Sequence, residues 1–447
     1  MCKCKYEKTR AFINGKLAAL LYTIIACVTV SFSLENYAIP LFILWILFVL
    51  LMEKSFLNVF LPMTLLCGFA LRTSGQSTYL LKHVWLAVPV VIVFVLHFVI
   101  HGVRVRRGRL LFAQVGISAA LLLGGAFHIS SENYFKLDVL YYVIFLGVGM
   151  IFFYLWFLSG VSSNEYYDAR EKLLECFLFL GVFCAYSIID QMLRTFLTEG
   201  VLIHAFVWSN DICELMMFCI PAAFYYASKN YFFTFVGIFF YGIMLFTNSL
   251  SAVATGAVLL VLCLLFLIKN RRDKRPLTVA ILSLFLLSAA AALVVMLDRN
   301  GGFLAWLAEE ENGRQGYALA AWENFLSSPI FGVGMGALGN ENTTFMTIVW
   351  MHNFILQILG SMGLLGLAAY GYQLYVRVRL ARRHRDPRSF ACFLSYVGLF
   401  LISMFQPGEF CPMPYALMAV MIFSVLEVTD TERQTKTKND EKNAVSS

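Results

Sequence analysis

Two residues of chemical interest, His352 and Asn353, stand together where a polar loop gives way to a long apolar run. We predict that this run is a helix beginning at Asn353. The free backbone N–H groups of a helix start carry a partial positive charge. That field disfavours an imidazolium ion, so we expect His352 to be a neutral imidazole able to act as a general base. The alternative is an interfacial histidine beside Trp350 with no chemical role.

A second candidate, Arg314, lies in a long polar segment that precedes the histidine. Residues 303–329 carry apolar side chains at near-helical spacing, which predicts two short amphipathic helices on the membrane surface, broken at Asn312-Gly313. Arg314 begins the second of them. An arginine presents several N–H donors in a fixed fork and so binds a diphosphate well. The alternative is a solvated ion pair with the glutamates at 309–311.

The elements that position these residues follow from composition. The chain has 447 residues, of which 60% are hydrophobic and only 14% are charged, against about 25% charged in soluble proteins. Apolar runs of roughly 17 to 25 residues recur along it, each long enough to cross about 30 Å of hydrocarbon. They are too apolar for alternating barrel strands. We therefore predict an all-α, polytopic transmembrane helical bundle of about 12–14 spans with a large extracytoplasmic loop.

The net charge of +7 has the distribution expected of a membrane protein. Lysine and arginine gather in short loops, as the positive-inside rule predicts, so no nucleic-acid partner is indicated. Cys2 and Cys4 do not make a complete metal site, and we expect no metal. The predicted spans cover roughly residues 17–34, 37–52, 56–71, 79–100, 110–129, 139–158, 173–192, 212–227, 232–246, 252–268, 277–297, a helix from 353, 390–405 and 415–428. The second and third could instead be re-entrant.

These spans divide the chain into five parts. They are a cytoplasmic N-terminal tail (1–16), N-terminal transmembrane helices (17–297), a large extracytoplasmic loop carrying short amphipathic helices (298–352), C-terminal transmembrane helices (353–428) and a disordered cytoplasmic tail (429–447). With both termini in the cytoplasm, every strongly basic loop falls on the cytoplasmic side and the long loop falls outside.

The turn PIFGVGMG, followed by HNFILQILGSMGLLGL, resembles the O-antigen ligase and O-antigen polymerase superfamily of bacterial integral-membrane glycosyltransferases. In that family a PxxGxG turn and an HNxxLQ…G(L)xG helix bracket a large extracytoplasmic loop. The glycines alone are a weak signal. Gly332, Gly334 and Gly336 do not follow a strand and no Lys-Ser/Thr comes after them, which argues against a nucleotide-binding loop.

The resemblance implies transfer of a glycan from an undecaprenyl-diphosphate carrier to an acceptor hydroxyl on the outer membrane face. It assigns the base to His352 and the cation that stabilises the departing diphosphate to Arg314. We expect an inverting, metal-independent enzyme without a cofactor. The residues that we expect to bind substrate, some of which also have capping or packing roles open to them, are Arg194, Arg299, Asn353, Gln357, Gly332 and Gly334.

One departure from the family concerns a second arginine. The family often places it in a Thr-x-Ser-Arg-like stretch, where this chain reads FTNSLSAVATG and Leu250 stands at the arginine position. Arg194, Arg299 or Arg72 could replace it, because all three fall on the outer face of the predicted topology. Arg194 is the first choice. The alternative is that these arginines only reach toward lipid headgroups.

The acceptor separates two closely related functions. We favour a polymerase, which joins carrier-linked repeat units of a surface polysaccharide, over a ligase, which attaches the finished polysaccharide to an anchor. A transporter or flippase of lipid-linked glycan is the alternative from another class, and it would favour charged residues at mid-membrane. The expected partners are the carrier-linked oligosaccharide, the lipid bilayer of a bacterial inner membrane, and possible chain-length-regulating and other polysaccharide-assembly proteins.

Overall fold

The computed structural model describes residues 12–13, 15–72, 85, 87–125, 140, 143–162, 168–202, 209–299, 314–335, 351–383, 386–406, 408–409 and 414–428. For residues 87, 292–299 and 314–315 it describes the backbone only. Cys2, Cys4 and the first of the two predicted surface helices lie outside the described residues.

The described part of the chain is all-helical, as predicted, and contains no strand. Its main helices are α2 (Lys16–Ser31), α3 (Glu35–Met52), α4 (Phe60–Arg72), α6 (Ala87–His101), α7 (Leu110–Leu123), α10 (Met150–Ser162), α11 (Ala169–Glu199), α12 (Ser209–Lys229), α13 (Phe232–Met244), α14 (Leu250–Asn270), α15 (Arg275–Arg299), α17 (Arg314–Ser327), α18 (Phe354–Arg383), α19 (Pro387–Ile402) and a last helix, Pro414–Val428. Within the described residues, six helical stretches are long and apolar enough to cross a membrane, and seven shorter apolar helices accompany them.

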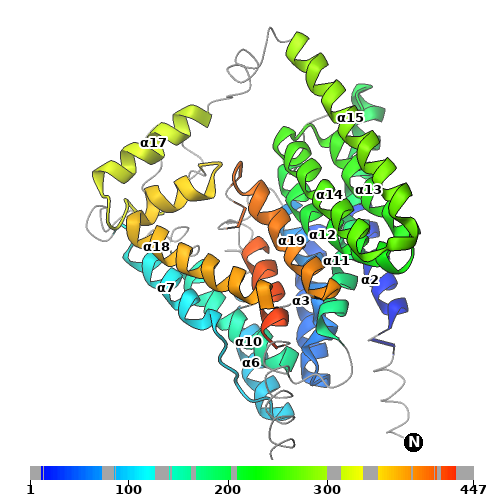
Figure 1. Cartoon of the computed structure of the whole chain (residues 1–447). Helices are drawn as coiled ribbons and strands as arrows, with labels where there is room; N and C mark the ends of the chain where they lie inside the picture. The colour runs from blue at the N-terminus through cyan, green and yellow to red at the C-terminus, as the bar shows by residue number, and fades with distance from the viewer. Residues whose placement is uncertain are drawn as a thin grey trace, which may run out of the picture.

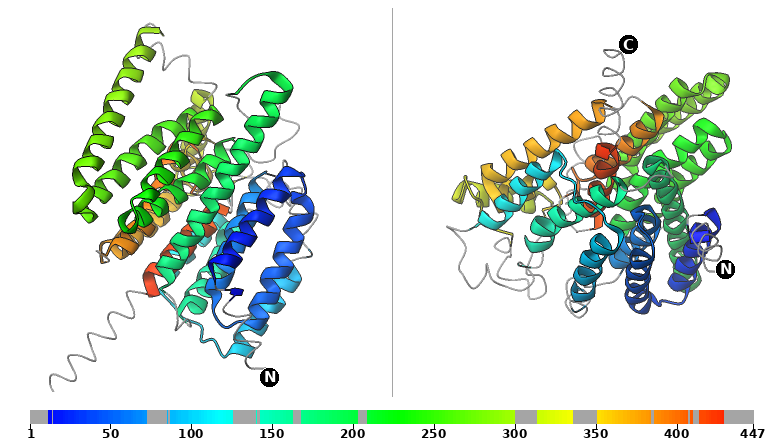
Figure 2. Two further views of the ribbon diagram at one scale, coloured as in Figure 1. Left: turned by 90° about the vertical axis from the view of Figure 1, so that its right-hand side faces the viewer. Right: turned by 90° about the horizontal axis from the view of Figure 1, so that it is seen from below.

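The bundle is organised around α12, which packs against α11, α13, α14 and α19 (Figure 1). Nearly all of its side chains are buried, whereas a helix at the edge of a bundle shows a buried face and an exposed one. The helix α15 is the opposite case. Only 6% of its apolar stretch is buried, and Figure 2 shows it standing at the edge of the molecule. An apolar helix with so little protein contact fits an environment of lipid.

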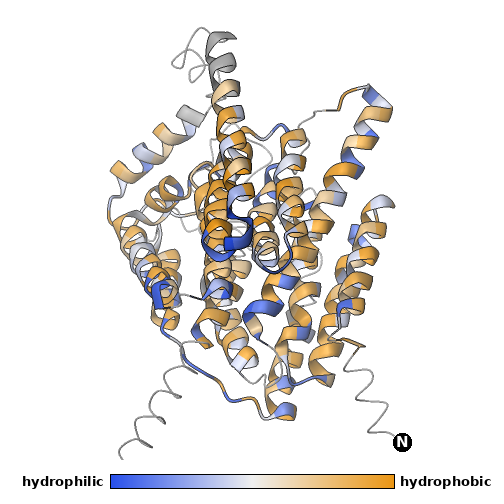
Figure 3. Cartoon of the chain, turned by 45° about the vertical axis from the view of Figure 1, so that its right-hand side comes forward, coloured by the Kyte–Doolittle hydropathy of each residue, from blue (hydrophilic) through white to orange (hydrophobic). Residues whose placement is uncertain are grey.

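Figure 3 shows apolar residues along the helices and hydrophilic residues concentrated toward their ends. An ion pair and a hydrogen bond between helix ends join the basic segments to one another. At the start of α11, Arg170 lies 3.0 Å from Asp386, which precedes α19. The Arg271 guanidinium donates to the Ala227 carbonyl oxygen at 3.0 Å, which links the end of α14 to the end of α12. The basic segments at these helix ends therefore share one end of the bundle, and the positive-inside rule predicts that this end faces the cytoplasm.

The helices α3 and α4 form a hairpin. Arg72 at the end of α4 forms a salt bridge of 3.0 Å with Glu35 at the start of α3. Because the pair closes the open end of the hairpin, the two helices run alongside each other over their full length. Of the two, α3 is long and apolar enough to cross a membrane, whereas Phe56–Arg72, which contains α4, is one of the shorter apolar helices.

Asp168 joins helix ends at the basic end of the bundle through contacts that require its ionised carboxylate, so we expect them to be sensitive to acid. Its carboxylate caps α11, accepting from the Arg170 backbone at 3.0 Å, and pairs with the side chains of Arg170 and Arg388 at 2.7 and 2.5 Å. Burial opposes ionisation, but these hydrogen bonds and charges outweigh it and lower the pKa of Asp168 from 3.8 to about 2. A lowered pKa stabilises the folded protein above pH 3.8, and that contribution disappears as the pH falls through about 2.

We therefore expect Asp168→Asn to lower the melting temperature of detergent-solubilised protein at pH 7, and the difference from wild type to shrink between pH 4 and 2. Thermal unfolding at a series of pH values measures both. Asp273→Asn is the matched control, because that carboxylate is 59% exposed and its pairing with Arg271 is solvated. A constant difference between Asp168→Asn and wild type over the whole range would contradict the expectation.

Candidate functional site

The start of α18 is fixed by Asn353. Its side-chain oxygen accepts from the backbone N–H groups of Ile355 at 3.0 Å and Leu356 at 3.1 Å, which makes it the N-cap. Its side-chain nitrogen donates to the Met404 carbonyl oxygen at 2.9 Å. The helix therefore begins at Phe354, one residue after the predicted start, and the cap also ties it to the chain that leaves α19.

His352 immediately precedes this cap, in the left-handed backbone region with φ +46°. Such a conformation is uncommon for a residue other than glycine and occurs often at functional sites. Its Nδ1 lies 2.9 Å from the side-chain oxygen of Gln406, and its ring centroid lies 5.7 Å from that of Tyr317. With the Gln406 oxygen as acceptor, Nδ1 carries the proton and Nε2 presents a lone pair. This is the tautomer that a general base requires at Nε2.

The helix α17 begins at Arg314, as predicted, and lies over the start of α18. Ala321 of α17 packs with Val333 and Met351 in a small buried cluster. Tyr317, in the first turn of α17, is the residue that reaches the His352 ring. The first turn of α17 therefore lies beside the histidine. The side chain of Arg314 lies outside the described residues, so its predicted role stays a prediction.

The Gly-rich turn packs directly onto α18. The backbone N–H of Gly334 donates to the Ser361 carbonyl oxygen at 3.0 Å, and that of Leu364 donates to the Pro329 carbonyl oxygen at 2.8 Å. The N–H of Gly332 is used within the turn, by the Ser328 carbonyl oxygen at 2.8 Å. Because the N–H groups of both predicted substrate-binding glycines are already engaged, the turn is built to hold α18 in place.

The helix α18 is broken at Gly363, where φ is 61° and ψ is −154° (Figure 1). The apolar sequence of this stretch predicted one uninterrupted helix. A Cβ at this position would lie 2.6 Å from the Pro329 carbonyl oxygen and the Ile330 carbonyl carbon. The break thus lets the Gly-rich turn fit against the helix and separates a short first segment, which starts at Phe354, from the rest of α18.

Gly363→Ala is expected to destabilise the protein by roughly 1–3 kcal/mol, because the backbone region that Gly363 occupies is nearly restricted to glycine and the added methyl meets backbone atoms. A fall in melting temperature measures it. Gly371→Ala, in the same helix, is the control, since a Cβ there meets nothing within 4 Å. It should be neutral or slightly stabilising. Equal melting temperatures for the two variants would contradict this account.

The other predicted arginines are placed differently. Arg194, near the end of α11, lies 2.8 Å from Asp190 and also donates to the Ser31 carbonyl oxygen. These described contacts bring it to the ends of α2 and α11, and none reaches His352. The side chain of Arg299 lies outside the described residues. Leu250, which stands where the family often has an arginine, begins α14 and is 38% exposed.

Two buried glutamine side chains near the histidine have a side-chain nitrogen without a hydrogen-bond partner among the described residues. The Gln357 oxygen accepts from the Met351 backbone at 2.8 Å, but its nitrogen has no partner among the described residues. The nitrogen of Gln406 is likewise unpartnered there. A buried donor without an acceptor is unfavourable. These nitrogens are therefore candidates for binding a ligand hydroxyl or phosphate oxygen.

A buried charged cluster, which was not predicted from the sequence, supports the same site. Glu409 forms an ion pair with Arg377 of α18 and accepts from Tyr370 at 2.5 Å and Tyr396 at 2.8 Å. Glu409 belongs to the segment 403–409, which also carries Gln406. That segment therefore contacts both His352 and the second half of α18. A lone carboxylate between two apolar runs was the available sequence signal.

Residues 234–371 match the family model described as O-antigen ligase. The matched region extends from α13 into α18 and includes the Gly-rich turn, Arg314, His352, Asn353 and Gln357. Gln406 and Glu409 lie outside it. No curated protein matches the chain.

Proposed function

We propose that this multi-pass membrane enzyme of the O-antigen ligase type moves a glycan from an undecaprenyl-diphosphate carrier to an acceptor hydroxyl on the outer membrane face. The observation that carries the proposal is the environment of His352. His352 belongs to the part of the chain that matches the family and lies beside the first turn of α17, and its Nδ1 is held by Gln406 at 2.9 Å.

In the proposed reaction the acceptor oxygen attacks the anomeric carbon of the carrier-linked sugar. The bond from that carbon to the diphosphate oxygen breaks, and undecaprenyl diphosphate departs with the electron pair. The acceptor proton passes to Nε2 of His352, and the resulting imidazolium is stabilised by the Gln406 oxygen on Nδ1. The imidazolium later releases the proton to water. A single displacement of this kind inverts the anomeric configuration.

The departing diphosphate needs cationic stabilisation, which we assign to Arg314 at the start of α17. The helper arginine remains Arg194 or Arg299. For sugar hydroxyls we favour Gln357, whose side-chain nitrogen has no partner among the described residues. Asn353 is engaged at both ends of its amide, so we assign it to positioning His352.

The glycan profile of cells lacking the protein tests the proposal and identifies the acceptor. A polymerase predicts surface glycans of a single repeat unit, because repeats cannot be joined. A ligase predicts full-length chains that stay on the carrier. Re-expression of the wild-type protein should restore the normal profile in either case. Carrier-linked glycan that accumulates on the cytoplasmic leaflet would overturn the proposal and indicate a flippase.

A further inference from the structure

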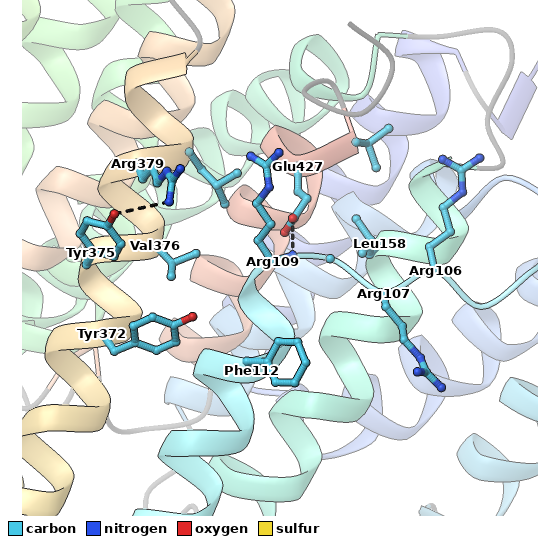
Figure 4. Close-up of a pocket in the computed structure, with 13 residues that line it drawn as sticks. Arg106, Arg107, Arg109, Phe112, Leu158, Tyr372, Tyr375, Val376, Arg379 and Glu427 are labelled. Carbon is cyan, nitrogen blue, oxygen red and sulfur yellow. Dashed lines mark hydrogen bonds between the residues drawn. The ribbon is translucent and has the colours of Figure 1, made fainter. Parts of the chain in front are cut away.

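A pocket of about 870 Å³ opens at the basic end of the bundle, and Figure 4 shows the residues that line it. Its α18 residues belong to the second half of that helix, away from His352. The loop between α6 and α7 forms one side of it, and the second half of α18 forms another. The last helix completes the wall with Glu427 and Val428. Neither the proposed reaction nor the family match assigns a role to this pocket.

The pocket is strongly cationic. Arg106, Arg107, Arg109 and Arg379 line it, against the single carboxylate of Glu427. Both oxygens of that carboxylate are engaged, one by the Arg109 backbone N–H and the other by the Tyr154 hydroxyl at 2.5 Å. No carboxylate among the described residues pairs with Arg106, Arg107 or Arg379. Guanidinium groups that line a pocket and have no acidic partner of their own, as these three do among the described residues, suit a phosphate.

The rest of the wall is aromatic and apolar. Phe112 of α7 is 74% exposed, and Tyr372 and Tyr375 of α18 are about half exposed. The Tyr375 hydroxyl accepts from Arg379 at 3.4 Å, and Figure 4 shows the two side chains joined in this way. Aromatic rings beside arginines at the ends of membrane helices are typical of the headgroup level of a bilayer. A free phosphate in solution would gain nothing from the exposed ring of Phe112.

We propose that this pocket binds the phosphate of an anionic phospholipid in the leaflet at the basic end of the protein. The arginines contact the headgroup phosphate, and Phe112 with the tyrosines packs against the upper part of the lipid. Basic pockets between membrane helices on the cytoplasmic side commonly bind anionic headgroups in this way. The site is separate from the glycan-transfer site, and the proposal does not depend on the transfer reaction.

The test measures the dissociation constant of phosphatidylglycerol for the full-length protein in a neutral detergent, by native mass spectrometry. Wild type is expected to bind phosphatidylglycerol more tightly than phosphatidylcholine. The double variant Arg107→Gln/Arg379→Gln is expected to raise the dissociation constant about 25-fold, since each arginine near an anionic surface contributes about a factor of five. Arg107→Lys/Arg379→Lys should retain much of the affinity.

The matched control is Arg272→Gln/Lys274→Gln, which removes the same charge at the same end but outside the pocket. Its affinity should equal that of wild type. Equal losses in the two Gln variants would overturn the proposal, because the attraction would then belong to the whole basic end. Equal affinity for phosphatidylcholine would also overturn it.

Inorganic phosphate that displaces the lipid at equal concentration would refute a lipid site and indicate a free-phosphate site. Melting temperatures without lipid check that each variant is folded.

Discussion

A His352→Ala variant is expected to accumulate in the membrane at the wild-type level and to transfer glycan about 10²- to 10⁴-fold more slowly, the range that a positioned general base contributes. The ring is partly buried beside Tyr317 and is not part of the main core, so its removal should not prevent folding. The rate is measured with purified protein and a carrier-linked oligosaccharide. Activity equal to wild type in a folded variant would remove His352 from the mechanism.

A variant of Gln406 tests the same mechanism with a smaller expected loss of rate. Gln406→Leu leaves the imidazole in place but removes the acceptor 2.9 Å from Nδ1, so the ring can rotate or change tautomer. We expect a loss of rate smaller than that of His352→Ala, together with a displaced pH–rate profile. A purely structural role for Gln406 would lower the amount of folded protein without moving that profile. His101→Ala, at the other end of the molecule, is the matched histidine control.

The parts of the site that the sequence predicted correctly depend on local signals. An apolar run after the histidine-asparagine pair predicts a helix there, and α18 begins at Phe354 with Asn353 as its cap, the role that stood as the alternative to substrate binding. A Gly-containing break before an amphipathic stretch predicts a helix start, and α17 begins at Arg314. The basic segments predict a shared end of the bundle, and the salt bridge between Arg170 and Asp386 joins two of them.

The parts that it did not predict depend on contacts between distant segments. The break at Gly363 exists because the Gly-rich turn donates to and accepts from α18 there, and glycine at a regular spacing fits an unbroken packed helix equally well. Gln406 lies 54 positions after His352, so no local pattern joins them. Arg377 stands in a basic run that the positive-inside rule explains without a partner. Only the fold shows that it turns inward to Glu409.

Removing Glu409 is expected to have the largest effect on stability. Arg377 and Glu409 are 5% and 4% exposed, and the carboxylate also accepts from Tyr370 and Tyr396. Glu409→Ala leaves a buried guanidinium without its counter-charge, which typically costs about 3–5 kcal/mol. We expect a large fall in the melting temperature of the detergent-solubilised protein. Glu409→Gln, which keeps an acceptor for the tyrosines but loses the charge, should fall between Glu409→Ala and wild type.

The double variant Arg377→Met/Glu409→Leu separates charge pairing from the fold of the segment 403–409. Replacing both members of a buried ion pair by apolar side chains is often neutral or stabilising, so the double variant should recover most of the stability that Glu409→Ala loses. Its glycan-transfer rate then reports on positioning. If the pair holds the segment so that Gln406 reaches His352, the double variant is stable but slow. A double variant as unstable as Glu409→Ala would show that the two side chains do not act as a pair. A double variant that transfers glycan at the wild-type rate would show that Gln406 is positioned without this ion pair.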